Sequence, residues 1–479
     1  MSLLDLFNIS ALQHGGFVAL GLLIYFVVTR ATRQRRHPSA ALAWVMSLAL
    51  LPYLAIPAFL MFGTRKVERP APARRLALPQ DPDTPRWLAP LLAGMGIAPA
   101  SANQRVTFDA DGAQALATLT GLIEQARHEL VLGTYVLGHH GVGLQIAQAL
   151  MGAAQRGVSV RLLIDAVGSW RAPPTLLWRL SASGVQVRRF MPLLLNSVRG
   201  HTNLRNHRKL VVADGHRLWA GGRNLASEYF VDQVGEPAWT DLSFTLEGAI
   251  AGEALAAFER DWRKSSDDWL SGRTRAPAGA PPAPAGPRAV GATPPPAPDG
   301  HTHVAQWIPS GPDRFEDSLH ALLMAGVYQA RHRVLAMSPY FVPDDALLNA
   351  LCTASRSGVQ VCLVLPARSN HRLADLARHR ALRALAEAGA TIVLTDAMVH
   401  AKVLMFDDDV ALCGSANLDG RSLFLNYEAM TAFYSAADIA WIDKWFDARA
   451  RAGHAYQPRP PNWFQDLAEG LVRVVGFQL

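Results

Sequence analysis

The scarcity of cysteine excludes more kinds of site than any other shortage in this sequence. The 479-residue chain has three, Cys352, Cys362 and Cys413, all within apolar stretches of its second half. An odd number without metal-ligand spacing predicts neither a disulfide framework nor a zinc site. We therefore expect buried thiols, and a chemistry that depends neither on a thiolate nor on a bound metal.

Lysine is also scarce. Of the 46 basic residues, only five are lysine: Lys66, Lys209, Lys264, Lys402 and Lys444. Lys209 and Lys402 occupy the same place in two copies of one short motif, described below. Since the chain otherwise uses arginine, whose guanidinium is a planar fork, an ammonium at both places indicates a chemical requirement for a compact charge.

A nucleotide-binding loop is absent, because no Gly-x-x-x-x-Gly-Lys-Ser/Thr stretch occurs. Basic residues number 46 against 39 acidic ones, which gives a net charge of +7 and a pI of about 9.5. This excess favours an anionic partner, either a nucleic acid or an anionic lipid surface. The charge by itself does not choose between them.

Two long segments near the N-terminus favour the lipid surface. Residues 11–29 and 41–63 contain no charged side chain, and the longer of them extends about 35 Å as a helix, enough to cross a bilayer. We expect a transmembrane hairpin, kinked in its second span at Pro52 and Pro57. Arginines follow both spans, so the positive-inside rule leaves the orientation open. A cleaved signal peptide is the alternative for the first segment, but it lacks a basic leader.

The rest of the chain contains an internal duplication. Gln-Ala-Arg-His precedes an apolar run at residues 125–128 and again at 329–332, and a turn glycine, Gly157 or Gly358, precedes a buried strand in each half. The same order of helices and short apolar strands recurs. It predicts an α/β fold with two homologous lobes, each with a mixed central sheet flanked by helices, and an active site between the lobes.

Composition marks the boundaries of these units. The segment between the lobes is rich in Pro, Ala and Gly and has no apolar periodicity, which predicts a tether. The last residues mix aromatic, aliphatic and charged side chains, which predicts an amphipathic helix in the membrane interface or a helix packed on the core. The predicted division is 1–70 membrane hairpin, 100–272 first lobe, 273–300 linker, 301–457 second lobe and 458–479 C-terminal segment.

One polar motif occurs once in each lobe with identical spacing. The first copy is His207, Lys209 and Asp214, then Gly221-Gly222-x-Asn224; the second is His400, Lys402 and Asp407, then Gly414-Ser415-x-Asn417. Two aligned copies of so specific a pattern do not arise by chance. The two-residue spacing places the His and Lys of each copy on one face of a strand. Lobes that face each other would bring both copies around one small anionic centre.

Two imidazoles suit exchange at a phosphodiester. A neutral imidazole attacks phosphorus and a protonated one gives the leaving alkoxide its proton; a pKa near 6.5 allows both forms at neutral pH. The two lysines stabilise charge on the phosphoryl oxygens, and Asn224 and Asn417 are expected to hydrogen-bond a phosphate oxygen. A zinc site is disfavoured because a lysine lies beside each histidine.

The duplicated His-x-Lys-x4-Asp-x6-Gly-Ser/Gly-x-Asn pattern resembles the phospholipase D superfamily. Within it, the paired apolar segments and the stretches SPYFVPD and RSLFLNYE are similar to bacterial cardiolipin synthases. This resemblance implies transfer of a phosphatidyl group between two phosphatidylglycerol molecules through a phosphohistidine, with release of glycerol. A hydrolytic phospholipase D acting on membrane phospholipids is the alternative. The apolar segments disfavour a nuclease of this superfamily, and the intact motifs disfavour a catalytically dead lipid-binding scaffold.

The resemblance also implies roles for individual residues. His207 is the expected nucleophile and His400 the general acid and later the base, and the near symmetry of the motifs leaves the reverse order open. Members of the superfamily place a carboxylate behind each histidine to orient its ring. Glu428 matches that pattern, and Asp241 is its expected counterpart in the first lobe. A surface carboxylate is the alternative for Asp241.

The remaining motif residues have less direct roles. Asp214 and Asp407 complete the catalytic motifs, where we expect them to order strand-end turns rather than to touch substrate. Ser415 joins the two asparagines as an expected phosphate ligand. Gly222 stands in its place in the first motif, so one hydroxyl is missing there, as in cardiolipin synthases.

The resemblance finally implies partners and a location. We expect no cofactor and no metal; the partners are phosphatidylglycerol, other anionic membrane phospholipids and the bilayer, and no nucleic acid. The location is the bacterial inner membrane, with several membrane passes. The side that the catalytic lobes face, the use of phosphatidylethanolamine as second lipid and the oligomeric state stay open.

Overall fold

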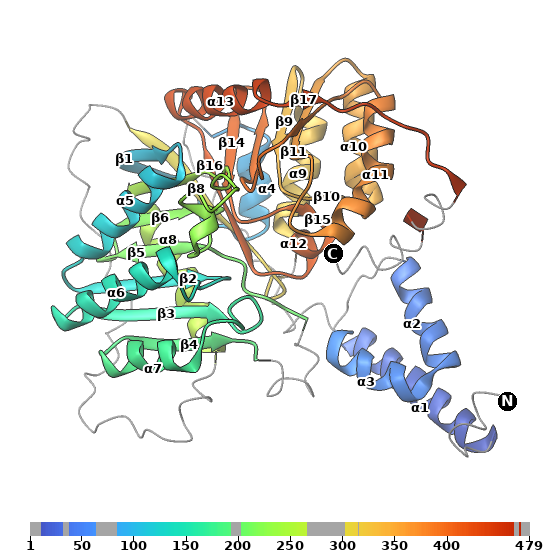
Figure 1. Ribbon diagram of the computed structural model, residues 1–479. Coiled ribbons are helices and arrows are strands. Elements are labelled where there is room, and N and C mark those ends of the chain that lie inside the picture. Colours follow the sequence, from blue (N-terminus) through green and yellow to red (C-terminus); the bar gives the residue numbers. More distant parts are fainter. Residues whose placement is uncertain are drawn as a thin grey trace.

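The computed structural model describes residues 11–31, 38–63, 84–192, 203–265, 302–314, 316–463 and 469–470. The predicted linker and most of the predicted C-terminal segment lie outside these ranges. Two α/β lobes share one continuous sheet, and the N-terminal helices lie to one side of them, as Figure 1 shows.

One mixed sheet of 15 strands runs through both lobes. The first lobe contributes β1 (Ser101–Asp109), β2 (Glu129–Thr134), β3 (Ser159–Asp165), β4 (Gln186–Phe190), β5 (Leu210–Ala213), β6 (Arg217–Gly221) and β7 (Ser243–Gly248). The second lobe contributes β8 (His303–Ser310), β9 (Arg333–Met337), β11 (Gln360–Pro366), β12 (Thr391–Thr395), β13 (Val403–Phe406), β14 (Val410–Gly414), β16 (Glu428–Phe433) and β17 (His454–Ala455). Strands β10 (Phe341–Val342) and β15 (Leu418–Asp419) form a separate parallel pair.

The strand order displays the duplication. From the centre outward, the first lobe reads β1, β7, β6, β5, β2, β3, β4, and the second reads β8, β16, β14, β13, β9, β11, β12. Strands β1 and β8 pair antiparallel, with Ser101 opposite Ala305, so an approximate twofold axis relates the lobes. The turn glycines match as well, since Gly157 has φ 90° and Gly358 has φ 91°, a conformation that suits glycine. The predicted fold class is confirmed.

Helices cover both faces of the sheet. Helices α8 (Ile250–Lys264) and α13 (Ala436–Arg451) pack on one face, over a hydrophobic core that both lobes share. Alternate residues of β3 divide between the faces, with Leu163 in the shared core and Leu162 in the core of the first lobe. The helices over the separate cores are α5 (Gly112–Gln125), α6 (Gly141–Gln155) and α7 (Pro174–Ala182), then α4 (Leu88–Gly94), α9 (Ser318–Gln329), α10 (Asp345–Arg356) and α11 (Arg372–Glu387).

The N-terminal apolar segments form three helices. Helix α1 spans Ala11–Ala31, and the predicted second span is divided into α2 (Pro38–Leu50) and α3 (Pro52–Phe62). The break has a local cause. Pro52 has no N–H to donate and its ring disfavours a helical residue before it, and Leu51 has φ −136° and ψ 56°.

Helix α3 turns back along α2 and lies beside α1. The rings of Trp44 and Phe59 are 5.1 Å apart, which joins α2 to α3. The imidazole Nδ1 of His14 lies 2.8 Å from the Tyr53 hydroxyl, and the Tyr25 ring packs 5.4 Å from that of Phe59. Residue numbers in these contacts increase together along both helices, so α3 runs parallel to α1.

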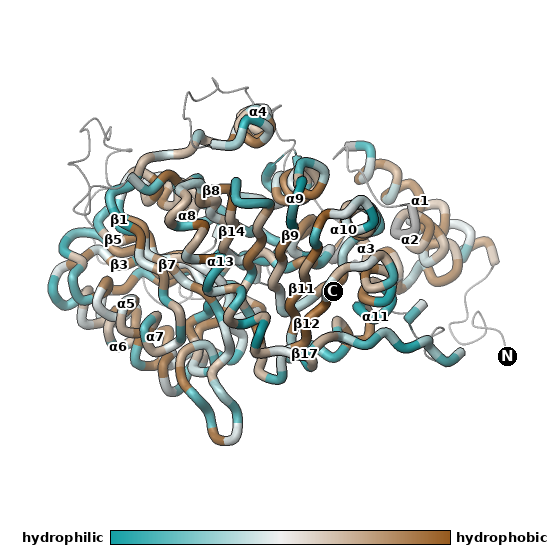
Figure 2. Tube along the Cα trace, turned by 90° about the horizontal axis from the view of Figure 1, so that it is seen from above, coloured by the Kyte–Doolittle hydropathy of each residue, from teal (hydrophilic) through white to brown (hydrophobic). Residues whose placement is uncertain are grey.

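This arrangement supports only the first of the two predicted membrane spans. Among the described residues, only Ala11–Arg30 forms a helix that is long and apolar enough to cross a membrane. The expected second span at 41–63, kinked at Pro52 and Pro57, is not supported, and neither is the expected multi-pass arrangement; Pro57 lies inside α3. Figure 2 shows hydrophobic colouring along α1 as well as along the central strands β9 and β11.

Candidate active site

The two motifs lie at equivalent positions in the two lobes. His207 and Lys209 immediately precede β5, and His400 and Lys402 immediately precede β13. They were predicted to lie within these strands, but both segments leave the sheet to contact the opposite lobe. The backbone N–H of His207 donates to the Tyr427 carbonyl at 2.9 Å, and that of His400 donates to the Thr240 carbonyl at 2.7 Å. The lobes therefore meet at the motifs, as the sequence predicted.

Each motif histidine contacts a carboxylate from the opposite lobe. The Nδ1 atom of His207 lies 2.9 Å from Oε1 of Glu428, and the Nδ1 atom of His400 lies 2.7 Å from Oδ2 of Asp241. All four side chains are buried. An Nδ1–H that donates to a carboxylate leaves the lone pair on Nε2, so each ring presents Nε2 as a base or nucleophile. The exchange of carboxylates between the lobes was not predicted from the sequence.

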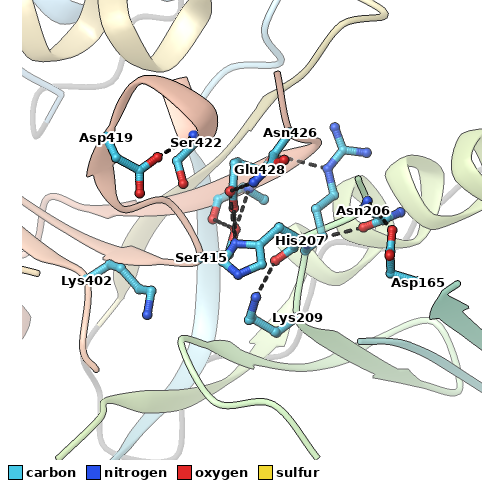
Figure 3. A network of polar contacts seen from close by, with 12 residues as sticks. Asp165, Asn206, His207, Lys209, Lys402, Ser415, Asp419, Ser422, Asn426 and Glu428 are labelled. Atoms are coloured by element: carbon cyan, nitrogen blue, oxygen red, sulfur yellow. Dashed lines mark hydrogen bonds and ion pairs between the residues drawn. The ribbon is translucent and has the colours of Figure 1, made fainter. Parts of the chain in front are cut away.

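Glu428 has two further partners, which Figure 3 shows around His207. The Ser415 hydroxyl donates to its Oε2 atom, and the Asn426 amide donates to its Oε1 atom at 3.2 Å. The same Ser415 oxygen accepts the Ala429 N–H at 3.0 Å. Ser415 was expected to bind phosphate, and the structure instead places its hydroxyl on the carboxylate that orients His207.

The two motif lysines are buried beside the histidines. The ammonium of Lys209 donates to the His207 carbonyl at 2.7 Å, and that of Lys402 lies 2.8 Å and 3.0 Å from the two ring nitrogens of His400. Burial lowers the pKa of Lys402 to about 8 and that of Lys209 well below its ordinary value. The site therefore holds cationic groups away from water and favours an anion between them.

The lysines also affect the histidines. Burial first, and then the charge of Lys402, lower the pKa of His400 to about 3. Burial lowers the pKa of His207 as well, against the opposing charge of Glu428. Each lysine also lowers the pKa of the histidine in the other motif, so both motifs share one electrostatic environment. Both imidazoles are therefore neutral before substrate binds.

The two motif asparagines differ in their contacts. The Asn224 amide donates to the Tyr229 hydroxyl at 2.8 Å. The Asn417 side chain contacts Asp419, a buried residue that caps the short helix α12 (Gly420–Phe424) by accepting the Ser422 N–H at 2.7 Å. Burial raises the pKa of Asp419 to about 6. Sequence analysis did not single out Asp419, because the first motif has alanine at the matching position.

The motif aspartates lie at the far ends of β5 and β13, away from the histidines. The Asp214 carboxylate accepts the backbone N–H groups of residues 127–129, and the Asp407 carboxylate accepts those of residues 331–333. Both residues have a left-handed backbone, with φ 52° and 49°. These contacts match the expected turn-ordering role and leave no aspartate of the motifs beside the phosphate position.

Aromatic rings line the site, and sequence analysis missed most of them. The Tyr135 ring packs 5.1 Å from that of His207, while the Tyr229 and Trp239 rings pack 4.9 Å and 5.6 Å from that of His400. Tyr135 directly follows the end of a buried strand, and that position was the signal in the sequence that could have identified it as a site residue. Phe341, which lies in the SPYFVPD stretch, is fully buried in the core of the second lobe.

Arg208, the middle residue of the first His-x-Lys, points away from the lysine into the interface between the lobes. Its guanidinium donates to both Asp261 carboxylate oxygens at 2.8 Å and 2.7 Å. It also donates to the carbonyls of Ser310 and Glu428 at 2.9 Å and 3.0 Å. The arginine thus fixes the backbone of the carboxylate residue that orients its neighbour His207. Sequence analysis assigned this position no role.

Within the described part of the chain, no group of three or more His, Cys, Asp or Glu side chains is placed to hold a metal ion. The chemistry available at the site is that of two neutral imidazoles, two carboxylates behind them and two ammonium groups. This set can bind a phosphodiester and move protons at both of its ester oxygens.

Comparisons with known proteins agree with this site. The family model described as "Cardiolipin synthase, PLD-like domain" matches residues 119–262 and 323–450, more than half of the chain. Cardiolipin synthase A of Erwinia tasmaniensis is 31% identical, over 94% of this chain and 95% of the relative. The corresponding figures for cardiolipin synthase A of Serratia proteamaculans are 31%, 92% and 93%, and for the cardiolipin synthase of Geobacillus kaustophilus 28%, 88% and 85%.

A solved structure shares the fold. The phosphatidylserine synthase of Haemophilus influenzae superimposes with a TM-score of 0.60 at 15% identity, over 81% of this chain and 99% of that one. The family match covers more than half of the chain, and relatives at or above 30% identity match it over nearly their full length. The chain belongs to the cardiolipin synthase family of phospholipase D-like proteins.

Proposed function

We propose that this protein is a phosphatidyltransferase that makes cardiolipin from two phosphatidylglycerol molecules, with His207 and His400 as its two catalytic groups. One observation carries the proposal. Each histidine has its Nδ1 on a buried carboxylate of the opposite lobe, so that two Nε2 atoms are available at one cationic centre. A binding protein for phospholipids needs the cations but not two oriented imidazoles.

The first half-reaction transfers the phosphatidyl group to the enzyme. Nε2 of His207 attacks phosphorus as the bond from phosphorus to the glycerol oxygen breaks, and His400 gives its proton to that oxygen. His400 is neutral in the free enzyme, but the negative charge of the bound phosphodiester offsets the lysine charges and raises its pKa in the complex. Lys209 and Lys402 stabilise the phosphoryl oxygens. Glycerol leaves.

The second half-reaction transfers the group to the acceptor. His400, now neutral, takes the proton from a headgroup hydroxyl of a second phosphatidylglycerol as that oxygen attacks the phosphohistidine. The bond from phosphorus to His207 breaks and cardiolipin leaves. One phosphodiester is exchanged for another, so no nucleotide is consumed. The aromatic rings packed against both histidines favour an alcohol over water as the acceptor.

The location proposed with this function is the bacterial inner membrane. Helix α1 is the segment that would cross it, and the lipid substrates would be phosphatidylglycerol and other anionic phospholipids. The net charge of +7 supports an anionic lipid surface as partner.

Purified protein with labelled phosphatidylglycerol tests the overall reaction. We expect cardiolipin and glycerol in equal amounts from the wild type, and neither from His207→Ala or His400→Ala. Phosphatidic acid in place of cardiolipin would establish the hydrolytic alternative. Normal turnover in either variant would refute the paired-histidine mechanism.

The order of the two histidines needs a separate test. A phosphatidyl ester of p-nitrophenol has a leaving group that needs no proton, so the acid can be removed without blocking the first step. We expect His400→Ala to release one equivalent of p-nitrophenol and to retain a phosphatidyl group on His207, detected by mass spectrometry. A label on His400 in the His207→Ala protein would reverse the assignment.

A further inference from the structure

Two loops, one in each lobe, present a large apolar side chain to solvent. Trp170 lies between β3 and α7 and is 68% exposed, and Leu373 lies at the start of α11, directly after the loop from β11, and is 52% exposed. Strands β3 and β11 occupy equivalent places in the two halves of the sheet. The two side chains therefore lie at equivalent edges of the lobes.

The first of these loops contacts the residues around His207. The Asp165 carboxylate, at the end of β3, accepts the backbone N–H of Asn206 at 2.9 Å. The Ser169 hydroxyl donates to the carbonyl of Tyr135 at 2.8 Å, and the Tyr135 ring packs on the His207 ring. Two residues, Ser169 and Tyr135, thus connect Trp170 to the catalytic His207.

The second loop contacts the other side of the site. The Tyr340 hydroxyl donates to the Asn370 side chain at 2.6 Å, and its ring lies 6.1 Å from that of His371. The residue after Tyr340 begins β10, which pairs with Leu418, the neighbour of motif residue Asn417. Leu373 follows two residues after His371, so it lies on the segment that contacts Tyr340.

The charge of both loops has one sign. The Arg171 guanidinium packs 5.2 Å from the centre of the Trp170 ring, and Arg368 and Arg372 flank the second loop as exposed residues. Neither residues 166–174 nor residues 367–374 contain an aspartate or glutamate. Exposed apolar side chains among arginines fit the interface of an anionic bilayer, where indole rings lie at the headgroup level and guanidinium groups bind phosphates.

We propose that Trp170 and Arg171, together with the 368–373 loop, form a rim that docks onto anionic membrane lipids and holds the catalytic opening against the headgroups. This inference rests on the proposed function for its choice of partner. Helix α1 would hold the chain at the membrane. The rim adds orientation. It brings the histidines to the depth of the lipid phosphates, so that the substrate need not leave the bilayer.

The test uses the full chain, whose cysteines are all buried. Single Trp170→Cys and Leu373→Cys variants are labelled with an environment-sensitive fluorophore and reconstituted into phosphatidylglycerol vesicles. Matched controls are Trp178→Cys, on the outer face of α7 and 61% exposed in the wild type, and Tyr328→Cys, near the end of α9 and 66% exposed. Tyr328 precedes β9, at the edge opposite the catalytic residues.

We expect a lipid with a quencher near its headgroup to reduce the fluorescence at 170 and 373 but not at 178 or 328, and aqueous iodide to do the reverse. Iodide access at 170 and 373 equal to that of the controls would overturn the proposal. Shielding from iodide without lipid quenching would also overturn it, because a second copy of the chain would then cover the rim. Equal quenching in zwitterionic vesicles would remove the role of the arginines.

The same labels in a His207→Ala background separate this proposal from the proposed function. We expect quenching to persist there, because docking does not depend on the reaction. Quenched labels together with no cardiolipin from the wild-type protein would refute the reaction but leave the rim in place. An active enzyme with unquenched labels would do the opposite.

Discussion

The Asp241 carboxylate lies so close to the Gly222 backbone that a Cβ on Gly222 would be 2.2 Å from Oδ1 of Asp241. In the second lobe the matching pair is Ser415 and Glu428, and there the serine hydroxyl bonds to the carboxylate. Aspartate is one methylene shorter than glutamate, so its carboxylate reaches the histidine only by lying closer to the strand. The Gly/Ser difference between the motifs therefore follows the Asp/Glu difference between their carboxylates.

Gly222→Ala should inactivate the enzyme through His400. The added Cβ displaces the Asp241 carboxylate, and a misplacement of about 1 Å in a catalytic group lowers kcat by roughly 100-fold. The measurement is cardiolipin formation by protein that has kept its thermal unfolding transition. Gly252→Ala on α8 is the control, since a Cβ there meets no atom within 4 Å. Equal activities of the two variants would contradict the steric argument.

Ser415→Ala should change the pH dependence of the reaction. Burial raises the pKa of Glu428, but His207, Lys209 and the Ser415 hydrogen bond outweigh it and lower the pKa. Without the hydroxyl, Glu428 takes up its proton at higher pH, so the acid limb of kcat/KM should move to higher pH, with kcat lower by about 10-fold. Ser415→Thr retains a hydroxyl and should restore the wild-type limb. If the Ser415 hydroxyl bound the substrate phosphate instead, Ser415→Ala would raise KM and leave the pH profile unchanged.

The sequence was sufficient for the features that repeat. The paired motifs and the two lobes follow from residue identity and spacing, because each copy supports the interpretation of the other. Both orienting carboxylates were implied by the resemblance to the phospholipase D superfamily. What it could not predict depends on contacts between distant segments. The exchange of Glu428 and Asp241 between lobes, and the Ser415 contact, appear only once the lobes meet. A kink at Pro52 was predicted, but the reversal of chain direction there was not, since hydropathy measures the length of a segment and not its direction.

Arg208→Ala should destabilise the junction of the lobes. The change leaves the Asp261 carboxylate buried without its guanidinium, and breaking a buried pair in this way costs about 3–5 kcal/mol. The free energy of unfolding in detergent measures this loss. Arg451→Ala removes an arginine from an exposed pair with Asp447, and we expect a change within about 0.5 kcal/mol. Similar losses from both variants would show that buried Arg208 contributes no more to stability than an exposed arginine does.

Asp407→Asn should lower stability and spare catalysis. Asparagine tolerates the left-handed backbone but accepts the three N–H groups less strongly, a loss of about 1–3 kcal/mol. The kcat per folded molecule should stay at the wild-type value, whereas Asp241→Asn should abolish it. Asp409→Asn is the control, because it also removes one carboxylate from the same turn. Burial, and then the charge of Asp407, raise the pKa of Asp409. A large fall in kcat at unchanged stability would place Asp407 in the chemistry after all.

Lys402→Met should abolish activity and yet stabilise the fold. Burial lowers the pKa of Lys402 from 10.5 to about 8, so at neutral pH the folded protein holds an ammonium in an environment that disfavours it. Below pH 8 both the folded and unfolded states carry the proton, and the full penalty applies. Between pH 8 and 10.5 only the unfolded state binds it, so the stability of the wild type rises with pH through this window.

The advantage of the methionine variant should therefore be constant below pH 8 and vanish as the pH approaches 10.5. Thermal unfolding in detergent across this range measures it, with Lys444→Met on α13 as the control for loss of a lysine elsewhere in the second lobe. The same substitution should raise the pKa of His400, because the charge of Lys402 lowers it. A variant less stable than the wild type at pH 7 would mean that the ammonium holds Asp241 and Glu428 together more strongly than burial opposes it, and catalysis would then not be the reason for a buried lysine.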